Sequence, residues 1–198
     1  KDWANNEYNK FTLDDGQEYE NVTFSVNRNG STFLIDNNTE KMLDKYYVYS
    51  VENPVVIKEI NTDPIEKYVV KLNGTELEAG EDYITENVNN EGEWNERTYT
   101  INKKLFEGEG EYSIVVESTD KAETASYSDI KGLDVSWIVD QTAPVVAVSG
   151  LENSGRYKTE SQTVTAIPTD DGGKLKSFKA VVADKSGTVK KNNELEGK

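Results

Sequence analysis

The chain contains neither cysteine nor histidine among its 198 residues. Without cysteine it can form no disulfide, and no thiol chemistry is available to it. Without either residue, histidine-based catalytic triads, Cys–His dyads and zinc sites built from His or Cys ligands are excluded within this chain. What chemistry remains must therefore use carboxylates, hydroxyls, amides, amines or aromatic rings.

Positive charge is also scarce, because 22 lysines and arginines face 37 aspartates and glutamates, for a formal net charge of -15. A chain this acidic is repelled by nucleic-acid phosphates and by anionic lipid surfaces, so we expect no nucleic-acid partner. Three lysines near the C-terminus, Lys174, Lys176 and Lys179, are interpreted as one solvated strand face. No apolar run approaches transmembrane length, and we expect no membrane insertion by this segment.

Adjacent carboxylates are the remaining candidates for acid–base catalysis, as in glycosidases. Among 37 acidic residues, pairs such as Asp14–Asp15 and Asp170–Asp171 are expected by chance. Both pairs lie in turn-like sequence, where aspartate commonly hydrogen-bonds its own backbone. We therefore expect no catalytic residue, and we expect that the chain is not an enzyme.

What the sequence does contain is a series of short runs rich in Val, Ile, Tyr, Phe and Trp, separated by turn residues. Such a series is typical of an antiparallel all-β protein. The predicted strands are 22–26 with a hairpin return at 31–35, then 46–51, 55–57, 68–72, 75–77, 98–101, 112–116, 133–139, 145–149, 162–167, 177–182 and 188–189. Residues 102–106 are predicted to form one helical turn.

A short internal repeat divides the chain. Pro54-Val55-Val56 and Pro144-Val145-Val146 are the same tripeptide, ninety residues apart, and each opens a predicted first strand. That spacing matches one β-sandwich module of about a hundred residues. We therefore predict an N-terminal extension or the end of a preceding module at 1–19, a sandwich at 20–140, and a second, incomplete sandwich at 141–198 with an exposed sheet edge.

Two motifs resemble bacterial immunoglobulin-like domains in tandem. Gly110-x-Tyr112-x-Ile114-x-Val116, followed by Asp120-Lys121-Ala122, resembles the penultimate strand of that family. Residues 137–144, WIVDQTAP, are similar to its F-x-V-D-x-T-A-P junction between copies. The resemblance implies that Tyr112 is a corner tyrosine, with its ring in the core and its hydroxyl bonded to backbone. Glu123-Thr124 departs from the usual Gly-Asn, which puts any turn or cation site that relies on that pair in doubt.

This family is common in cell-surface proteins of Gram-positive bacteria, and the lack of disulfides suits a bacterial surface. The resemblance implies an extracellular, non-catalytic structural or adhesive repeat that spaces or presents a binding region. Its eventual partner is an unidentified protein or glycan of a host or neighbouring cell, and the chain is expected to be monomeric. The alternative is a carbohydrate-binding or accessory module of a secreted glycan-active enzyme.

A calcium site at the junction between modules is one hypothesis for a cofactor; no other cofactor is expected. Asp120, Asp140 and Thr142 offer the oxygen ligands that hard cations require, and such a site would stiffen the hinge. The plainer interpretation, which we favour, is that Asp140 caps a turn and Pro144 ends strand pairing.

Aromatic rings offer a second kind of site, because sugar faces stack on exposed rings. Trp94 stands out, since it follows a polar stretch in which a core role is not obvious, and Trp3, Tyr46, Tyr47 and Tyr49 are further candidates. Sandwich modules also bury one or two tryptophans. A ligand contact and a structural role therefore both remain open for Trp94, the structural role being slightly favoured.

Overall fold

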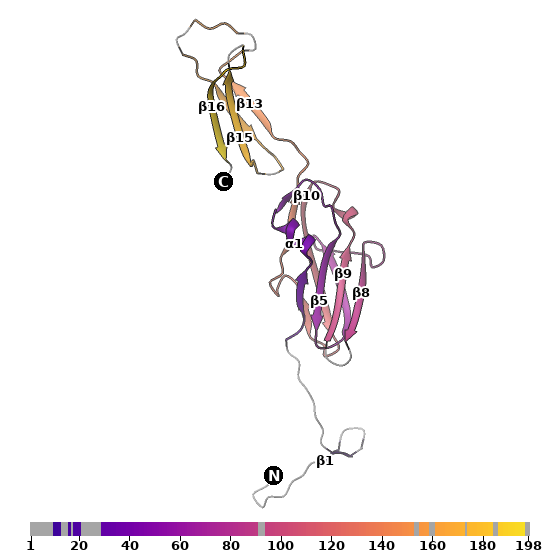
Figure 1. Cartoon of the computed structure of the whole chain (residues 1–198). Helices are drawn as coiled ribbons and strands as arrows, with labels where there is room; N and C mark the ends of the chain where they lie inside the picture. Colours follow the sequence, from indigo (N-terminus) through magenta and orange to yellow (C-terminus); the bar gives the residue numbers. More distant parts are fainter. Residues whose placement is uncertain are drawn as a thin grey trace, which may run out of the picture.

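The computed structural model (Figure 1) describes residues 10–12, 16, 18–20, 29–90, 94–152, 155–158, 161–172, 174–183 and 186–196. Most of its elements are strands, and the chain is all-β as the sequence predicts. The helices in the described residues are one α-helix, α1 (Asn37–Leu43), and one 3-10 helix, η1 (Lys103–Phe106). The second of these confirms the helical turn predicted at 102–106.

Residues 29–140, here called the first unit, contain two sheets. The four-stranded sheet has the order β3 (Thr32–Ile35), β5 (Val55–Asn61), β9 (Trp94–Ile101) and β8 (Tyr83–Asn90). The six-stranded sheet has the order β4 (Tyr47–Val48), β12 (Val135–Val139), β10 (Gly110–Asp120), β6 (Ile65–Leu72) and β7 (Thr75–Glu76), with β11 (Ala125–Tyr127) also on β10. The pairs are antiparallel except that β4 and β12 run parallel.

The two sheets of the first unit share one hydrophobic core. Several strands bury alternate residues, as the period of two in a β-strand requires. Strand β12 does so along its whole length, and β10 does so from Ile114 to Asp120. Strand β5 alternates strictly between buried and half-buried positions along its whole length. The largest fully buried apolar side chains come from both sheets and from η1: Trp137, Tyr99, Phe106, Ile57, Ile101 and Ile114.

The described neighbour of strand β3 is β5, with Thr32 opposite Ile60. The hairpin that the sequence predicts between residues 22–26 and 31–35 lies partly outside the described residues. Helix α1 follows β3 at once and was not predicted. Asp36 starts this helix, since its side chain accepts a hydrogen bond from the Thr39 backbone N–H at 2.9 Å, which is the standard stabilisation of a helix N-terminus.

The chain enters and leaves the first unit at opposite ends of its strands (Figure 1). Ser31 lies where the chain enters, and its neighbour Asn61 hydrogen-bonds Asp120, the last residue of β10. The chain leaves after Val139, which pairs with Gly110, the first residue of β10. Ten residue steps at about 3.3 Å each separate the two ends of β10 by roughly 33 Å.

Residues 141–196, here called the second unit, form two separate two-stranded sheets in the described residues: β13 (Val145–Ser149) with β14 (Thr165–Thr169), and β15 (Ser177–Ala183) with β16 (Val189–Glu196). The repeated tripeptide has a different environment in each unit. Val55 is 1% exposed on a strand with two neighbours, whereas Val145 is 65% exposed on a strand paired on one side.

Two three-residue strands near the N-terminus, β1 (Lys10–Thr12) and β2 (Glu18–Glu20), pair with each other. Nothing in the described residues is a helix with the length and apolarity needed to span a membrane.

Candidate functional site

The link between the two units is held by the side chain of Glu109, in the turn before β10. Its Oε1 accepts a hydrogen bond from the Gln141 backbone N–H at 2.6 Å, and its Oε2 accepts one from the Thr142 hydroxyl at 3.0 Å. The Gln141 side-chain amide donates to the carbonyl oxygens of Glu107 and Tyr49, at 3.2 and 3.4 Å. Two successive linker residues are thus fixed to the first unit, which limits bending at this point.

Asp140 lies beside this group and serves the backbone. Its Oδ1 accepts a hydrogen bond from the Thr142 backbone N–H at 3.1 Å, and its own N–H donates to the Val48 carbonyl at 2.9 Å. A Cβ at Gly172 would lie 2.6 Å from Asp140 Oδ1, so glycine at that position leaves room for the carboxylate. This geometry agrees with the turn-capping interpretation of Asp140.

The hydrogen bonds at Glu109 make the link sensitive to acid. Donation from the Thr142 hydroxyl and the Gln141 N–H lowers the pKa of Glu109 below its ordinary value. A lowered pKa means that the charged form is favoured by folding, so the stabilisation is complete above the ordinary glutamate pKa of about 4.3. It is lost as the pH falls through the lower pKa of the folded chain.

We therefore expect the backbone amides of Gln141 and Thr142 to become more mobile below pH 4 while β10 stays ordered. ¹⁵N relaxation measured across an acid titration checks this expectation. In Glu109→Gln the titration step should vanish, because the side chain no longer ionises. An unchanged step in that variant would assign the transition to another carboxylate.

The structure does not bring the three predicted calcium ligands together. Asp140 and Thr142 lie at one end of the first unit, but Asp120 lies at the opposite end of β10, roughly 33 Å away along the strand. Asp120 is also 1% exposed and accepts hydrogen bonds from the Thr124 backbone N–H and the Asn61 side chain, at 2.8 and 3.1 Å. The expectation that Asp120 joins the junction is wrong, because the antiparallel strand carries it away from the hinge.

In the described part of the chain, no group of three or more His, Cys, Asp or Glu side chains is placed to hold a metal ion.

Trp94, the predicted ring contact, is the first residue of β9, and its backbone pairs with Asn90. Its side chain lies outside the described residues.

A group that the sequence analysis missed lies where the chain enters the first unit. Six buried polar residues, here called the polar cluster, are Ser31, Glu59, Asn61, Tyr99, Ser118 and Asp120. The carboxylate of Glu59 is at its centre. It accepts hydrogen bonds from the hydroxyls of Ser31 and Ser118, and from that of Tyr99 at 2.5 Å. Three donors replace the water that this carboxylate loses on burial.

Asn61 connects Glu59's partners to the second carboxylate. Its amide nitrogen donates to Ser31 Oγ at 3.0 Å and to Asp120 Oδ2 at 3.1 Å, while its carbonyl oxygen accepts from the Asp63 backbone N–H at 2.9 Å. The polar cluster therefore links β5 with β10 across the two sheets, and a buried network satisfied in this way favours one arrangement of the sheets.

Two further ionisable residues, Tyr99 and Arg97, lie near Glu59. Burial, together with the neighbouring Glu59 carboxylate, raises the pKa of Tyr99 far above its ordinary value, so its hydroxyl stays protonated and donates. The Arg97 guanidinium stacks on the Tyr68 ring, 4.1 Å from the centroid, and its Nη2 donates to the Ile65 carbonyl at 3.4 Å. Arg97 faces Glu59 across the strand pair, which places a cation on the inner face of the sheet.

The sequence carried a signal for this cluster. Val55, Ile57, Glu59 and Asn61 alternate along one strand, so the period of two places Glu59 and Asn61 on the same face as two core residues. A charged residue at an inward position is rarely buried without partners. That parity predicts a buried polar group at the end of β5, although it does not identify the donors.

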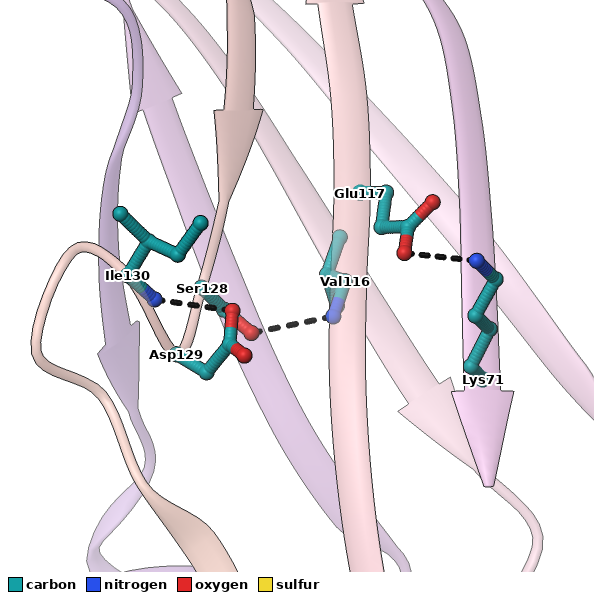
Figure 2. A network of polar contacts seen from close by, with 6 residues as sticks. All are labelled: Lys71, Val116, Glu117, Ser128, Asp129 and Ile130. Atoms are coloured by element: carbon teal, nitrogen blue, oxygen red, sulfur yellow. Dashed lines mark hydrogen bonds and ion pairs between the residues drawn. The ribbon is translucent and has the colours of Figure 1, made fainter. Parts of the chain in front are cut away.

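Two further contacts, one partly exposed and one buried, fix β10 to its neighbours (Figure 2). Lys71 on β6 forms an ion pair with Glu117 at 2.6 Å, with both side chains about one-third exposed. The buried hydroxyl oxygen of Ser128, after β11, accepts a hydrogen bond from the Val116 backbone N–H at 3.0 Å. An exposed ion pair contributes about 0–1 kcal/mol, so these contacts position β10 without suggesting a ligand.

A shallow groove of about 210 Å³ runs between α1 and the segment after β4. Its polar lining residues are Asn38, Thr39, Lys41, Lys45, Ser50, Glu52 and Asn53. Two tyrosines nearby are exposed, Tyr49 at 72% and Tyr46 at 44%, whereas Tyr47 is half-buried and meets the Tyr46 ring edge-on at 80°. The Tyr46 and Tyr47 rings therefore do not form a flat platform, and Tyr49 is the most exposed of the three.

No family model matches the chain, and a search of curated proteins finds no significant relative. The functional argument therefore depends on the geometry of the chain itself.

Proposed function

We propose that this chain is a non-catalytic structural or adhesive repeat of a Gram-positive cell-surface protein, which spaces or presents a binding region. In this proposal the first unit is an immunoglobulin-like sandwich and residues 141–198 belong to a second, incomplete one. The protein lies outside the cell, at its surface or in its wall. The binding region that the repeat spaces or presents has a protein or glycan of a host or neighbouring cell as its partner.

The observation that carries the proposal is the path of the chain through the first unit. Ser31 and Asp140 lie at opposite ends of the strands, and the link that follows is hydrogen-bonded to the unit through Glu109. When the polypeptide enters a repeat at one end and leaves at the other, that repeat adds its full length to a chain of repeats. A fixed link preserves that length better than a flexible one.

Two further features support an immunoglobulin-like first unit. The Tyr112 hydroxyl donates to the Gly108 carbonyl at 2.7 Å, and its ring stacks on Trp137 with centroids 5.6 Å apart. These contacts are the ones that the resemblance implies for a corner tyrosine, and they support the proposal. Trp137 itself is 1% exposed on the last strand of the unit. A tyrosine bonded to backbone a few residues upstream is a recurrent feature of such sandwiches.

The alternative function, carbohydrate binding, is favoured by one observation. Tyr49 is 72% exposed and precedes Ser50, which lines the groove beside α1. An exposed ring next to a polar groove is the arrangement that sugars use, with one face on the ring and hydroxyls on polar groups. This site differs from the Trp94 position that the sequence singled out.

Binding to a panel of immobilised glycans and extracellular-matrix proteins, with calcium present and then chelated, tests the proposal. We expect no glycan to bind, because a spacing repeat needs no ligand of its own. Protein binding would support an adhesive repeat. A reproducible glycan signal would overturn the proposal if Tyr49→Ala weakens it about tenfold while Tyr127→Ala, which alters an exposed tyrosine on β11, leaves it unchanged.

A further inference from the structure

The first unit is arranged so that tension between its two ends runs along its strands. Strand β3 begins at the end where the chain enters, and β12 finishes at the end where it leaves (Figure 1). Hydrogen bonds in antiparallel pairs lie perpendicular to the strands. Tension along the chain therefore loads all the bonds of each terminal strand together, rather than opening them one after another.

The two terminal strands differ in how firmly they are held. Strand β12 lies between β10 and β4 and buries Val135, Trp137 and Val139 in the core. Strand β3 has four residues and lies at the edge of its sheet, with β5 as its described neighbour. By pairing alone, β3 is the weaker of the two.

Ser31 compensates for this weakness. It immediately precedes β3 and is 2% exposed. Its backbone N–H donates to Ser126 Oγ at 2.8 Å, its hydroxyl donates to Glu59, and Asn61 donates to its Oγ at 3.0 Å. One residue is thus bonded to β5 and to the β11 strand of the other sheet.

Gly30 makes this contact possible. Its φ of +61° is unfavourable for residues with a side chain, and a Cβ there would lie 2.5 Å from Ser126 Oγ. Glycine lets the backbone approach β11 closely enough for the Ser31 N–H to reach the Ser126 hydroxyl. Glu59, which Ser31 contacts, also accepts hydrogen bonds from Tyr99 on β9 and from Ser118 on β10. Ser31 is therefore connected through Glu59 to both sheets.

We propose that the first unit resists mechanical tension and that Ser31 is the contact where this resistance is concentrated. Ser31 transmits tension from the incoming chain through the polar cluster to both sheets. This inference rests on the proposed function, because a repeat between a cell wall and a bound partner is under tension. It goes further by naming the residue where resistance to that tension is concentrated.

Two matched serine variants test the proposal. Ser31→Ala and Ser118→Ala each remove one buried hydroxyl from the same Glu59 oxygen, but only Ser31 lies next to a terminal strand. The full chain is held at its two ends and the unfolding rate of the first unit is measured at constant force. We expect Ser31→Ala to unfold about tenfold faster than the wild type, as loss of a hydrogen bond to a charged group implies.

Ser118→Ala should change the rate under tension less than Ser31→Ala. Because Ser31→Ala also removes an acceptor of Asn61, denaturant titration measures the equilibrium loss of each variant, and the rates are compared relative to that loss. Since the chain has no cysteine, a handle on Glu81→Cys can load the unit between that residue and the C-terminus without loading Ser31. When force is applied between residue 81 and the C-terminus, Ser31→Ala should accelerate unfolding no more than Ser118→Ala does.

Equal acceleration by both serine variants, or an effect of Ser31→Ala that is independent of the pulling geometry, would overturn the proposal. Gly30→Ala provides a second variant if Ser31→Ala does not fold, because it displaces the Ser31 N–H and keeps the hydroxyl. Neither result depends on the glycan and protein panel, so failure here leaves the proposed spacing function to be judged separately.

Discussion

Glu59→Ala is expected to destabilise the first unit by about 3–5 kcal/mol, because the hydroxyls of Ser31, Ser118 and Tyr99 lose their acceptor and each unsatisfied buried group costs about 1–3 kcal/mol. All three hydroxyls donate to this one carboxylate. For a domain of about a hundred residues, the loss corresponds to a fall of on the order of 15 °C in the midpoint of thermal unfolding. Circular dichroism during heating measures it.

Two comparisons make the Glu59 result specific. Glu59→Gln keeps one acceptor oxygen in the same place and should cost less than Glu59→Ala. Glu66→Ala removes an exposed glutamate on β6 and should lie within about 0.5 kcal/mol of the wild type, as surface substitutions usually do. If Glu59→Ala were as stable as Glu66→Ala, the polar cluster would not be a structural centre of the unit.

Trp137→Ala is expected to cost a similar amount, about 3–5 kcal/mol, through loss of apolar contacts and the cavity that remains. Its indole packs edge-on against Phe106, with ring centroids 4.9 Å apart, and stacks on Tyr112. The three rings close the core at the end where the chain leaves the unit. Urea titration followed by circular dichroism gives the free energy of unfolding directly.

Trp137→Phe should cost much less, about 1–2 kcal/mol, since an aromatic ring of smaller volume keeps part of the packing. The indole Nε1 is buried with no hydrogen-bond partner among the described residues, so phenylalanine removes an unsatisfied polar atom as well. Equal losses for the two variants would contradict this expectation, because they would mean that a phenyl ring at this position recovers none of the packing against Phe106 and Tyr112.

The strands that alternate β-branched or aromatic residues with polar ones were predictable. The runs 55–57 and 112–116 lie within observed strands, and 133–139 contains all of β12, because a face that must be buried imposes its period on the sequence. Strand β8 was missed, since its residues YITENVNN are mostly polar and it lies at a sheet edge, where pairing with β9 replaces burial. Helix α1 was missed although Asp36 and Thr39 supply a capping signal before it.

The candidate sites were harder to predict, because they depend on which strands meet. Gln141 and Thr142 were in the predicted hinge, but their partner Glu109 is more than thirty residues earlier in the chain. Ser31 and Ser118 meet at Glu59 from two different sheets. The alternation of residues along β5 predicts that the Glu59 side chain faces inward. Only the pairing of β3 with β5, and the packing of β5 against β10, could supply its donors.

The position of β12 between β4 and β10 also governs how the first unit can be assembled during synthesis. This last strand of the unit is an inner strand of its sheet, so the sheet stays divided until residues 135–139 have left the ribosome. The β4–β12 pair joins segments about ninety residues apart in sequence, and such distant pairings slow folding. We therefore infer that the first unit remains open, with Trp137's core site unfilled, until its own C-terminal strand arrives.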